Sequence, residues 1–229
     1  MDQNILKKQA AERAVKEVKS GMVVGLGSGS TMQFALEKLA EEIKKGGLYN
    51  IVGIPSSKNT EDEAVRLGIP LTTLNIQPVI DLTIDGADEA DEKMNLIKGG
   101  GGALLREKVV IQASKRVVIM IDESKLSKFL GEKFYVPIEV LSYALKVEEN
   151  FIQSLGAKTT VRKKTGDKPY ITDEGNIILD SKFEAIKDPD ELSRKIEMRA
   201  GIVEHGIFSS SLIEKIIVAG KNGVQEITH

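Results

Sequence analysis

Gly25–Thr31 (GLGSGST) combines glycines with hydroxyl side chains, between a short apolar run and a helical pattern of this 229-residue chain. Glycines let backbone N–H groups approach an anion, and the positive end of the following helix favours negative charge. Together with the hydroxyls of Ser28, Ser30 and Thr31, the segment can bind a terminal phosphate. A dinucleotide fingerprint would need glycine in place of Ser30, and a Walker A motif would need Gly-Lys-Ser/Thr. A tight turn with a serine cap is the simpler alternative.

Asp85–Glu89 (DGADE) places three acidic residues at the end of an apolar, strand-like run. Ligands of open α/β sheets bind beyond the carboxyl ends of parallel strands, which makes Asp85 and Asp88 candidates for acid–base catalysis. One alternative is a helix N-cap with Glu89 facing water. Another is a magnesium site, although no neighbouring residues complete a ligand set.

Lys98 precedes four consecutive glycines, Gly99–Gly102, which lead into an amphipathic helix. In regular structure each glycine costs ~0.5–1 kcal/mol relative to alanine, so the run suggests close approach of the backbone to a ligand. A flexible linker is the alternative. On the helix, Glu107 stands in a charged triplet of the kind usually found on a solvated surface. It is also close enough to the helix start to point back toward the glycines.

Few side chains are available for other kinds of chemistry. Cysteine is absent, and of the two histidines His205 lies in a strand pattern and is expected to be structural. Disulfides, thiolate zinc sites, cysteine nucleophiles and most histidine-based triads are therefore excluded. Lys125 follows another strand-like run and either reaches the same edge of the sheet or is an ordinary solvated lysine. Carboxylates and lysines are left to carry any proton transfer.

Charge and hydropathy exclude two further classes. The 32 basic and 34 acidic residues give a net charge of −2, which argues against a nucleic-acid partner. No apolar run approaches the roughly 18 residues of a membrane span, and the charged, helical N-terminal segment has no apolar signal region. We therefore expect a cytoplasmic protein with a small-molecule partner and no membrane partner.

Strand and helix patterns alternate through the first half of the chain, and near-continuous apolar strands indicate a parallel sheet. The sequence predicts an α/β fold: a mostly parallel, Rossmann-like sheet with helices on both faces, plus a small inserted ferredoxin-like α+β domain. The Asn222-Gly223 hairpin signal places the C-terminal strands in the first sheet. The predicted domains are residues 1–130 with 206–229, and residues 131–205.

These segments, taken together, resemble type A ribose-5-phosphate isomerase in order and spacing over nearly the whole chain. The matching segments are Gly25–Thr31, Asp85–Glu89, Lys98–Leu104, Arg106–Lys108 and Asp122–Lys125. Departures are small: Ser28 stands where many members have threonine, and Gly102 and Leu105 where others have alanine and threonine.

The resemblance implies interconversion of D-ribose 5-phosphate and D-ribulose 5-phosphate through an enediolate, in the non-oxidative pentose phosphate pathway, without metal or organic cofactor. It makes Glu107 the base, with Asp85, Asp88 and Lys98 as further catalytic residues. The implied substrate-binding residues are Ser28, Gly29, Ser30, Thr31, Asp85, Gly86, Ala87, Asp88, Lys98, Gly99, Gly100, Gly101 and Lys125. It also implies a homodimer or a homotetramer.

Two rival functions are compatible with the same pattern. One is another enzyme of this broad fold, such as a sugar-phosphate deaminase, or a CoA transferase that uses glutamate as a nucleophile. The other is a sugar-phosphate sensor without turnover, although no basic patch or spare helix-turn-helix for binding DNA is evident.

Overall fold

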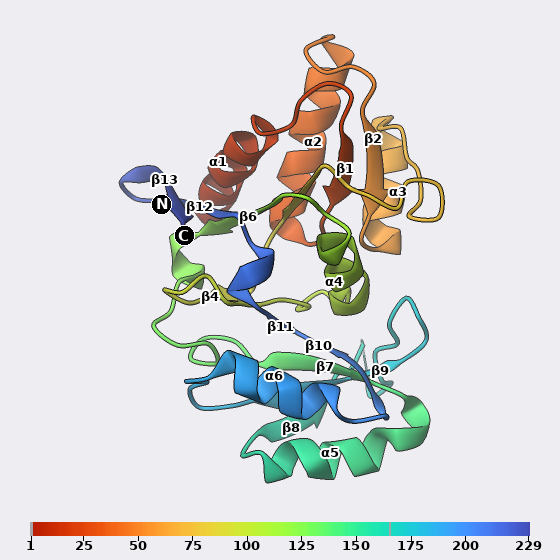
Figure 1. Cartoon of the computed structure of the whole chain (residues 1–229), viewed down its shortest axis with the longest axis vertical. Coiled ribbons are helices and arrows are strands. Elements are labelled where there is room, and N and C mark those ends of the chain that lie inside the picture. Colours follow the sequence, from red (N-terminus) through yellow and green to blue (C-terminus); the bar gives the residue numbers. More distant parts are fainter. Residues whose placement is uncertain (1, 165) are drawn as a thin grey trace. The chain divides into compact units, whose positions relative to one another are not determined.

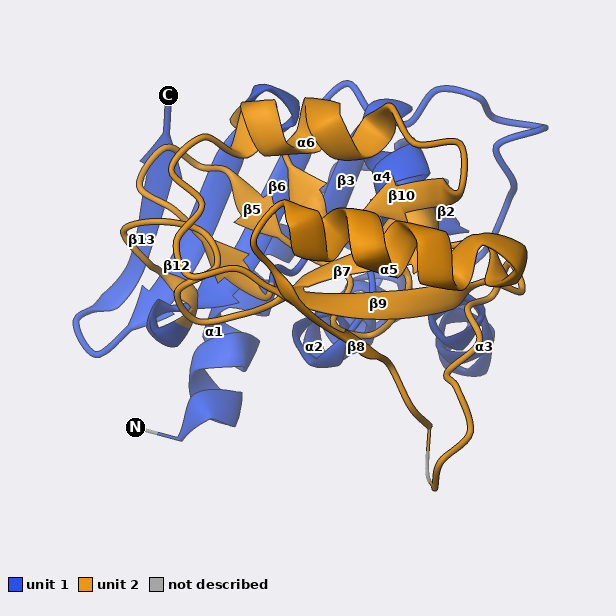
Figure 2. Ribbon diagram, turned by 90° about the horizontal axis from the view of Figure 1, so that it is seen from below, with its two compact units in different colours: residues 1–87, 106–124, 211–229 blue, residues 88–105, 125–210 orange. Residues whose placement is uncertain are grey.

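A computed structural model describes residues 2–164 and 166–229, and Met1 and Thr165 lie outside the described residues. The chain forms two compact units, coloured separately in Figure 2. The first comprises residues 1–87, 106–124 and 211–229, and the second comprises residues 88–105 and 125–210. No helix in the described part of the chain is long and apolar enough to span a membrane.

The first unit is built on a six-stranded sheet with the order β13-β12-β6-β3-β1-β2 (Figure 1). All neighbouring strands are parallel except the β12–β13 hairpin at the C-terminus. The predicted return of the C-terminal strands to this sheet is therefore confirmed. The strands are β1 (Val23–Leu26), β2 (Val52–Pro55), β3 (Leu82–Asp85), β6 (Val117–Asp122), β12 (Lys215–Gly220) and β13 (Gly223–Thr228).

Helices cover both faces of this sheet. Alternate residues of a strand point to opposite faces, so the strands contribute side chains to a core on each side. Val24 and Leu26 of β1 pack in one core with α1 (Gln3–Val15), α2 (Ser30–Lys44) and α3 (Lys58–Leu67). Val110 of α4 (Leu104–Gln112) packs in a separate core with Ile54 and Ile80. The α/β fold with a mostly parallel, doubly covered sheet is thus confirmed.

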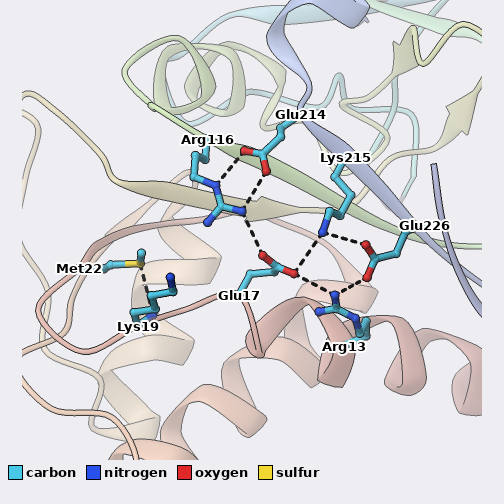
Figure 3. Close-up of polar contacts among 8 residues, drawn as sticks. All are labelled: Arg13, Glu17, Lys19, Met22, Arg116, Glu214, Lys215 and Glu226. Atoms are coloured by element: carbon cyan, nitrogen blue, oxygen red, sulfur yellow. Dashed lines mark hydrogen bonds and ion pairs between the residues drawn. The ribbon is translucent and has the colours of Figure 1, made fainter. Parts of the chain in front are cut away.

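An ion-pair network joins the N-terminal helix to the C-terminal strands (Figure 3). Glu17 accepts hydrogen bonds from Arg116 at 3.0 Å and from Lys215 at 3.2 Å, and it pairs with Arg13 at 2.9 Å. Arg13 also pairs with Glu226 of β13. Burial alone would raise the pKa of Glu17, but these three partners outweigh it and lower the pKa from 4.5 to about 2.

This network is expected to make the stability of the protein depend on pH in the acid range. Above pH 4.5 the Glu17 carboxylate is charged in both the folded and unfolded states, and the ion pairs contribute fully. As the pH falls from 4.5 toward 2, the unfolded chain takes up the proton first and the contribution is lost. We expect Glu17→Gln to lower the free energy of unfolding by about 2 kcal/mol at pH 7. Urea unfolding at pH 7 and at about pH 2.5 should show this difference shrinking in acid, and an equal difference at both pH values would contradict the prediction.

The second unit contains a four-stranded antiparallel sheet with the order β10-β7-β9-β8. Its elements follow one another as strand, helix, two strands, helix and strand, which is the ferredoxin-like pattern predicted from the sequence. They are β7 (Val136–Val140), α5 (Leu145–Ser154), β8 (Lys158–Val161), β9 (Ile177–Lys182), α6 (Pro189–Glu197) and β10 (Ile202–His205). Asp188 caps the start of α6, since its side chain accepts a hydrogen bond from the N–H group of Glu191 at 2.8 Å.

Both helices of the second unit pack on one face of this sheet (Figure 2). Ile152 of α5 and Ile196 of α6 share a core with alternate residues of β7 and β9, among them Ile138 and Leu179. Asp180, next to Leu179 on β9, belongs to the opposite face. That face is therefore available to the loops of the unit.

A small three-stranded sheet completes the second unit: β4 (Glu89–Ala90), β5 (Leu96–Ile97) and β11 (Ile207–Phe208), in the order β11-β5-β4. Ile97 and Ile207 belong to the core of the ferredoxin-like sheet. For this reason residues 88–105, 125–130 and 206–210 are part of the second unit, whereas the sequence-based division assigned them to the first domain. Gly206 separates β10 from β11: the residues before it pair with β7, and those after it pair with β5.

Candidate active site

The turn between β1 and α2 is held by a buried carboxylate. Asp85, the last residue of β3, accepts hydrogen bonds from the N–H groups of Ser28 at 3.0 Å and Gly86 at 2.7 Å. Only glycine fits at position 27, because a Cβ atom there would lie 2.0 Å from the Asp85 carboxylate. Thr31, in the first turn of α2, lies against Gly86. The structure thus brings together the hydroxyl turn and Asp85, as the sequence predicted.

The hydroxyl of Ser28 belongs to a cluster of hydroxyl groups at the ends of β1 and β2. It is 2.9 Å from the hydroxyls of both Ser56 and Ser57, and 3.2 Å from that of Thr60. Thr60 in turn donates to the carbonyl of Gly27 at 2.9 Å. These contacts fix the turn to the start of α3, which stiffens the backbone that leads into α2.

A cation missed by the sequence analysis stands at the N-terminus of α2. The Lys7 ammonium of α1 donates a hydrogen bond to the Ser30 hydroxyl at 3.0 Å, and Ser30 is exposed. Lys7 adds positive charge where the helix dipole is already positive. A pocket of about 320 Å³ borders this turn and is lined by Gly29 and Ser30, with Gln33 and Asn59 among its polar residues.

Glu107 is buried in the first turn of α4, with 5 % of its surface exposed. The hydroxyls of Thr83 in β3 and Ser114 just after α4 are 2.6 Å apart, and Val110 lies against β1. Glu107 precedes Val110 by about one helical turn, so it lies toward the end of α4 that is far from Ser114. Within the first unit, Glu107 therefore lies toward the carboxyl ends of β1 and β3, where Asp85 ends its strand.

The second unit carries Asp88, Lys98 and the glycine run. The Asp88 carboxylate accepts a hydrogen bond from the N–H group of Gly100 at 2.7 Å. Lys98 is buried, with 2 % exposed, and its ammonium is 5.6 Å from the centre of the Phe208 ring, within the range of a cation–π interaction. The backbone N–H group of Lys98 donates a hydrogen bond to the carbonyl of Gly206 at 2.9 Å. The glycine run is therefore a folded loop rather than a flexible linker.

Lys125, His205 and Glu89 are the remaining residues for which the sequence suggested a role or a position. Lys125 ends a short 3-10 helix (Glu123–Lys125) and is half-buried. His205 is buried in β10, and its Nε2 atom is 3.2 Å from Glu197, which agrees with the structural role expected for it. Glu89 is fully buried, against the alternative that it faces water. No group of three or more His, Cys, Asp or Glu residues in the described ranges 2–164 and 166–229 is arranged to hold a metal ion.

The fold and these residues define an α/β protein with a turn rich in glycine and hydroxyl groups, and with buried carboxylates at the carboxyl ends of parallel strands. Residues 52–223 match the model of the family described as ribose 5-phosphate isomerase A (phosphoriboisomerase A). The chain belongs to this family.

Similar proteins support the assignment over the full length. The ribose-5-phosphate isomerase A of Desulfatibacillum aliphaticivorans is 53% identical over 98% of this chain and 97% of its own. That of Chloroflexus aurantiacus is 48% identical over 97% of this chain and 92% of its own. A solved D-ribose-5-phosphate isomerase in complex with phospho-erythronic acid is 36% identical, with a TM-score of 0.97 and full coverage of both chains. The solved ribose 5-phosphate isomerase A of Methanocaldococcus jannaschii is 39% identical with a TM-score of 0.94, again covering all of both chains.

Proposed function

We propose that this chain is an aldose–ketose isomerase that interconverts D-ribose 5-phosphate and D-ribulose 5-phosphate through an enediolate. Membership of the ribose 5-phosphate isomerase A family supports the reaction. The observation that carries the chemistry is Glu107, a buried carboxylate toward the strand ends where Asp85 holds the hydroxyl turn. The solved relative with bound phospho-erythronic acid supports a sugar phosphate as ligand.

Glu107 is the proposed general base. In the open-chain aldose it removes the proton from C2, and the C1 carbonyl oxygen takes up the electron pair as the enediolate forms. The same carboxyl group then returns the proton to C1, while the proton of the C2 hydroxyl moves to the C1 oxygen. A well-placed base of this kind commonly contributes ~10²–10⁴ in rate.

The negative charge of the enediolate needs hydrogen-bond donors. We assign this role to the Lys98 ammonium and to N–H groups of the Gly99–Gly101 loop, where one good donor contributes roughly 3–4 kcal/mol. Asp85 and Asp88 are the proposed groups for ring opening and for proton transfer between the two oxygens. None of these steps requires a metal ion or an organic cofactor.

The proposed phosphate site is the turn Ser28–Thr31 together with Lys7. The exposed Ser30 hydroxyl and the N-terminus of α2 offer donors to a phosphate, and Lys7 supplies the opposite charge. Gly86, Ala87 and Lys125 complete the proposed contacts with the sugar.

Removal of the lysine charge should affect binding more than chemistry. We expect Lys7→Met to raise KM for ribose 5-phosphate about tenfold with kcat within threefold of the wild type, since the phosphate contact is the same in the ground and transition states. Steady-state kinetics measure both constants. Lys8→Met, a change at the exposed neighbour on the same helix, is the matched control and should leave KM unchanged. An unchanged KM in Lys7→Met would remove Lys7 from the phosphate site.

The reaction itself is tested by incubating the purified full chain with ribose 5-phosphate in the presence of EDTA and following ribulose 5-phosphate. We expect turnover that EDTA does not abolish. Loss of activity that magnesium restores would contradict the metal-free mechanism. Absence of turnover, together with a thioester on Glu107 after exposure to an acyl-CoA, would instead support the CoA transferase alternative.

We further propose that the enzyme is a cytoplasmic homodimer or homotetramer, as the family resemblance implies. Light scattering on the purified chain gives the number of subunits, and a monomer at micromolar concentration would contradict this proposal.

A further inference from the structure

The glycine loop of the second unit is held by one arginine side chain. Arg162, which follows β8, donates hydrogen bonds from Nη1 to the carbonyl of Gly99 at 2.9 Å and to that of Gly100 at 3.0 Å. The next carbonyl, that of Gly101, accepts a hydrogen bond from the Tyr170 hydroxyl at 3.2 Å. Three successive carbonyls of the loop are thus bound to side chains that lie more than sixty residues away in sequence.

The position of the arginine is itself fixed on several sides. Its Nε atom is 3.1 Å from both carboxylate oxygens of Asp180, on the face of the sheet opposite α5 and α6. The rings of Tyr135 and Tyr170 lie 5.7 and 5.9 Å from the guanidinium carbon. Only 9% of the arginine side chain is exposed. A planar guanidinium with both edges bound has little freedom to move.

The peptide geometry links this arrangement to the acid–base residues. In a trans peptide the N–H group points away from the preceding carbonyl, so the N–H groups of Gly100 and Gly101 are directed away from Arg162. The N–H group of Gly100 reaches Asp88 at 2.7 Å. Tyr170 also packs so closely that a Cβ atom at Gly102 would lie 2.5 Å from its ring.

We propose that Arg162, fixed by Asp180 and assisted by Tyr170, is a positioning residue for the isomerisation: it sets the direction of the glycine-loop N–H groups and of the Asp88 carboxylate. This inference rests on the proposed function, in which that loop and Asp88 act on the enediolate. Arg162 acts through the loop carbonyls.

A purely structural role for this ion pair is the alternative, and the chain offers a matched control for it. Arg199 also belongs to the second unit and binds the buried carboxylate of Glu148 at 2.9 Å. Its guanidinium also packs on an aromatic ring, that of Phe151, at 4.6 Å. Its partners are residues of α5.

The test compares Arg162→Met, Arg162→Lys and Tyr170→Phe with Arg199→Met, all in the full chain. Circular dichroism and thermal unfolding establish folding. Kinetics with ribose 5-phosphate give kcat and KM, and calorimetry gives the affinity for phospho-erythronic acid, whose carboxylate resembles the two oxygens of the enediolate. We expect Arg162→Met to lose about 10²-fold in kcat with KM within threefold, since small displacements of catalytic groups can cost that much. Inhibitor affinity should fall with kcat, Arg162→Lys should recover part of both, and Arg199→Met should keep kcat within threefold.

A folded Arg162→Met variant with kcat within threefold of the wild type would overturn the proposal. If that variant does not fold, wild-type kcat in folded Arg162→Lys and Tyr170→Phe would overturn it equally. Equal losses in Arg162→Met and Arg199→Met would assign the effect to general stability and reject a positioning role. An active Glu107→Gln variant beside an impaired Arg162→Met variant would reject the proposed base while supporting the role of Arg162.

Discussion

The Glu107→Gln variant is expected to lose about 10³-fold or more in kcat while remaining folded. Glutamine has nearly the same shape as glutamate, but its amide cannot accept the C2 proton. The buried position of Glu107 in the first turn of α4 makes this isosteric change the appropriate one, since a shorter side chain would also leave a cavity. KM should change little, because the carboxylate is needed for the transition state more than for binding.

Two measurements separate loss of the base from general damage. The first is exchange of the C2 proton of ribose 5-phosphate with deuterated solvent, which should be lost together with turnover. The second is the matched control Glu148→Gln, which changes another buried glutamate in the first turn of a helix, and should keep kcat within threefold. A Glu107→Gln variant with kcat within tenfold of the wild type would remove Glu107 as the base.

Glu89→Ala is expected to lower the free energy of unfolding by about 3 kcal/mol or more, the largest effect on stability that we predict. The Glu89 carboxylate is fully buried and accepts hydrogen bonds from three backbone N–H groups, those of Gly131 at 2.9 Å, Lys133 at 3.0 Å and Phe134 at 3.1 Å. Truncation leaves these donors without the acceptor and opens a cavity beneath the loop.

Urea unfolding followed by tyrosine fluorescence tests this prediction. The chain has no tryptophan and four tyrosines, and three of these lie in the second unit, so the signal reports mainly on that unit. Glu92→Ala, at an exposed position two residues beyond β4, is the matched control and should change stability by less than about 0.5 kcal/mol. Similar stabilities of Glu89→Ala and Glu92→Ala would show that the buried carboxylate is dispensable.

Much of the fold follows from local patterns. Apolar strands that alternate with amphipathic helices predicted the parallel sheet, because burial on both faces leaves no polar positions within a strand. Asn222-Gly223 predicted the terminal hairpin, because these two residues readily adopt the backbone conformation of a tight turn between strands.

Local sequence patterns could not predict the contacts that tertiary packing makes between distant segments. Lys7 lies in an ordinary helical segment, and only the packing of α1 beside α2 brings it to Ser30. Arg162 meets the glycine loop across more than sixty residues. The two-residue strands β4, β5 and β11 are too short to show any periodicity, and residues 88–105 were for that reason assigned to the other domain.

The late position of β12 in the chain has a consequence for the protein during its synthesis. Strand β6 pairs with β12 along one edge, in the register Val118 to Lys215, so its partner leaves the ribosome nearly a hundred residues later. The whole ferredoxin-like segment is translated in that interval. Until then β6 has an unpaired, apolar edge, and such edges readily pair with strands of other chains. The nascent chain is consequently most exposed to aggregation while its second unit is being made, and release of the last strands ends that period.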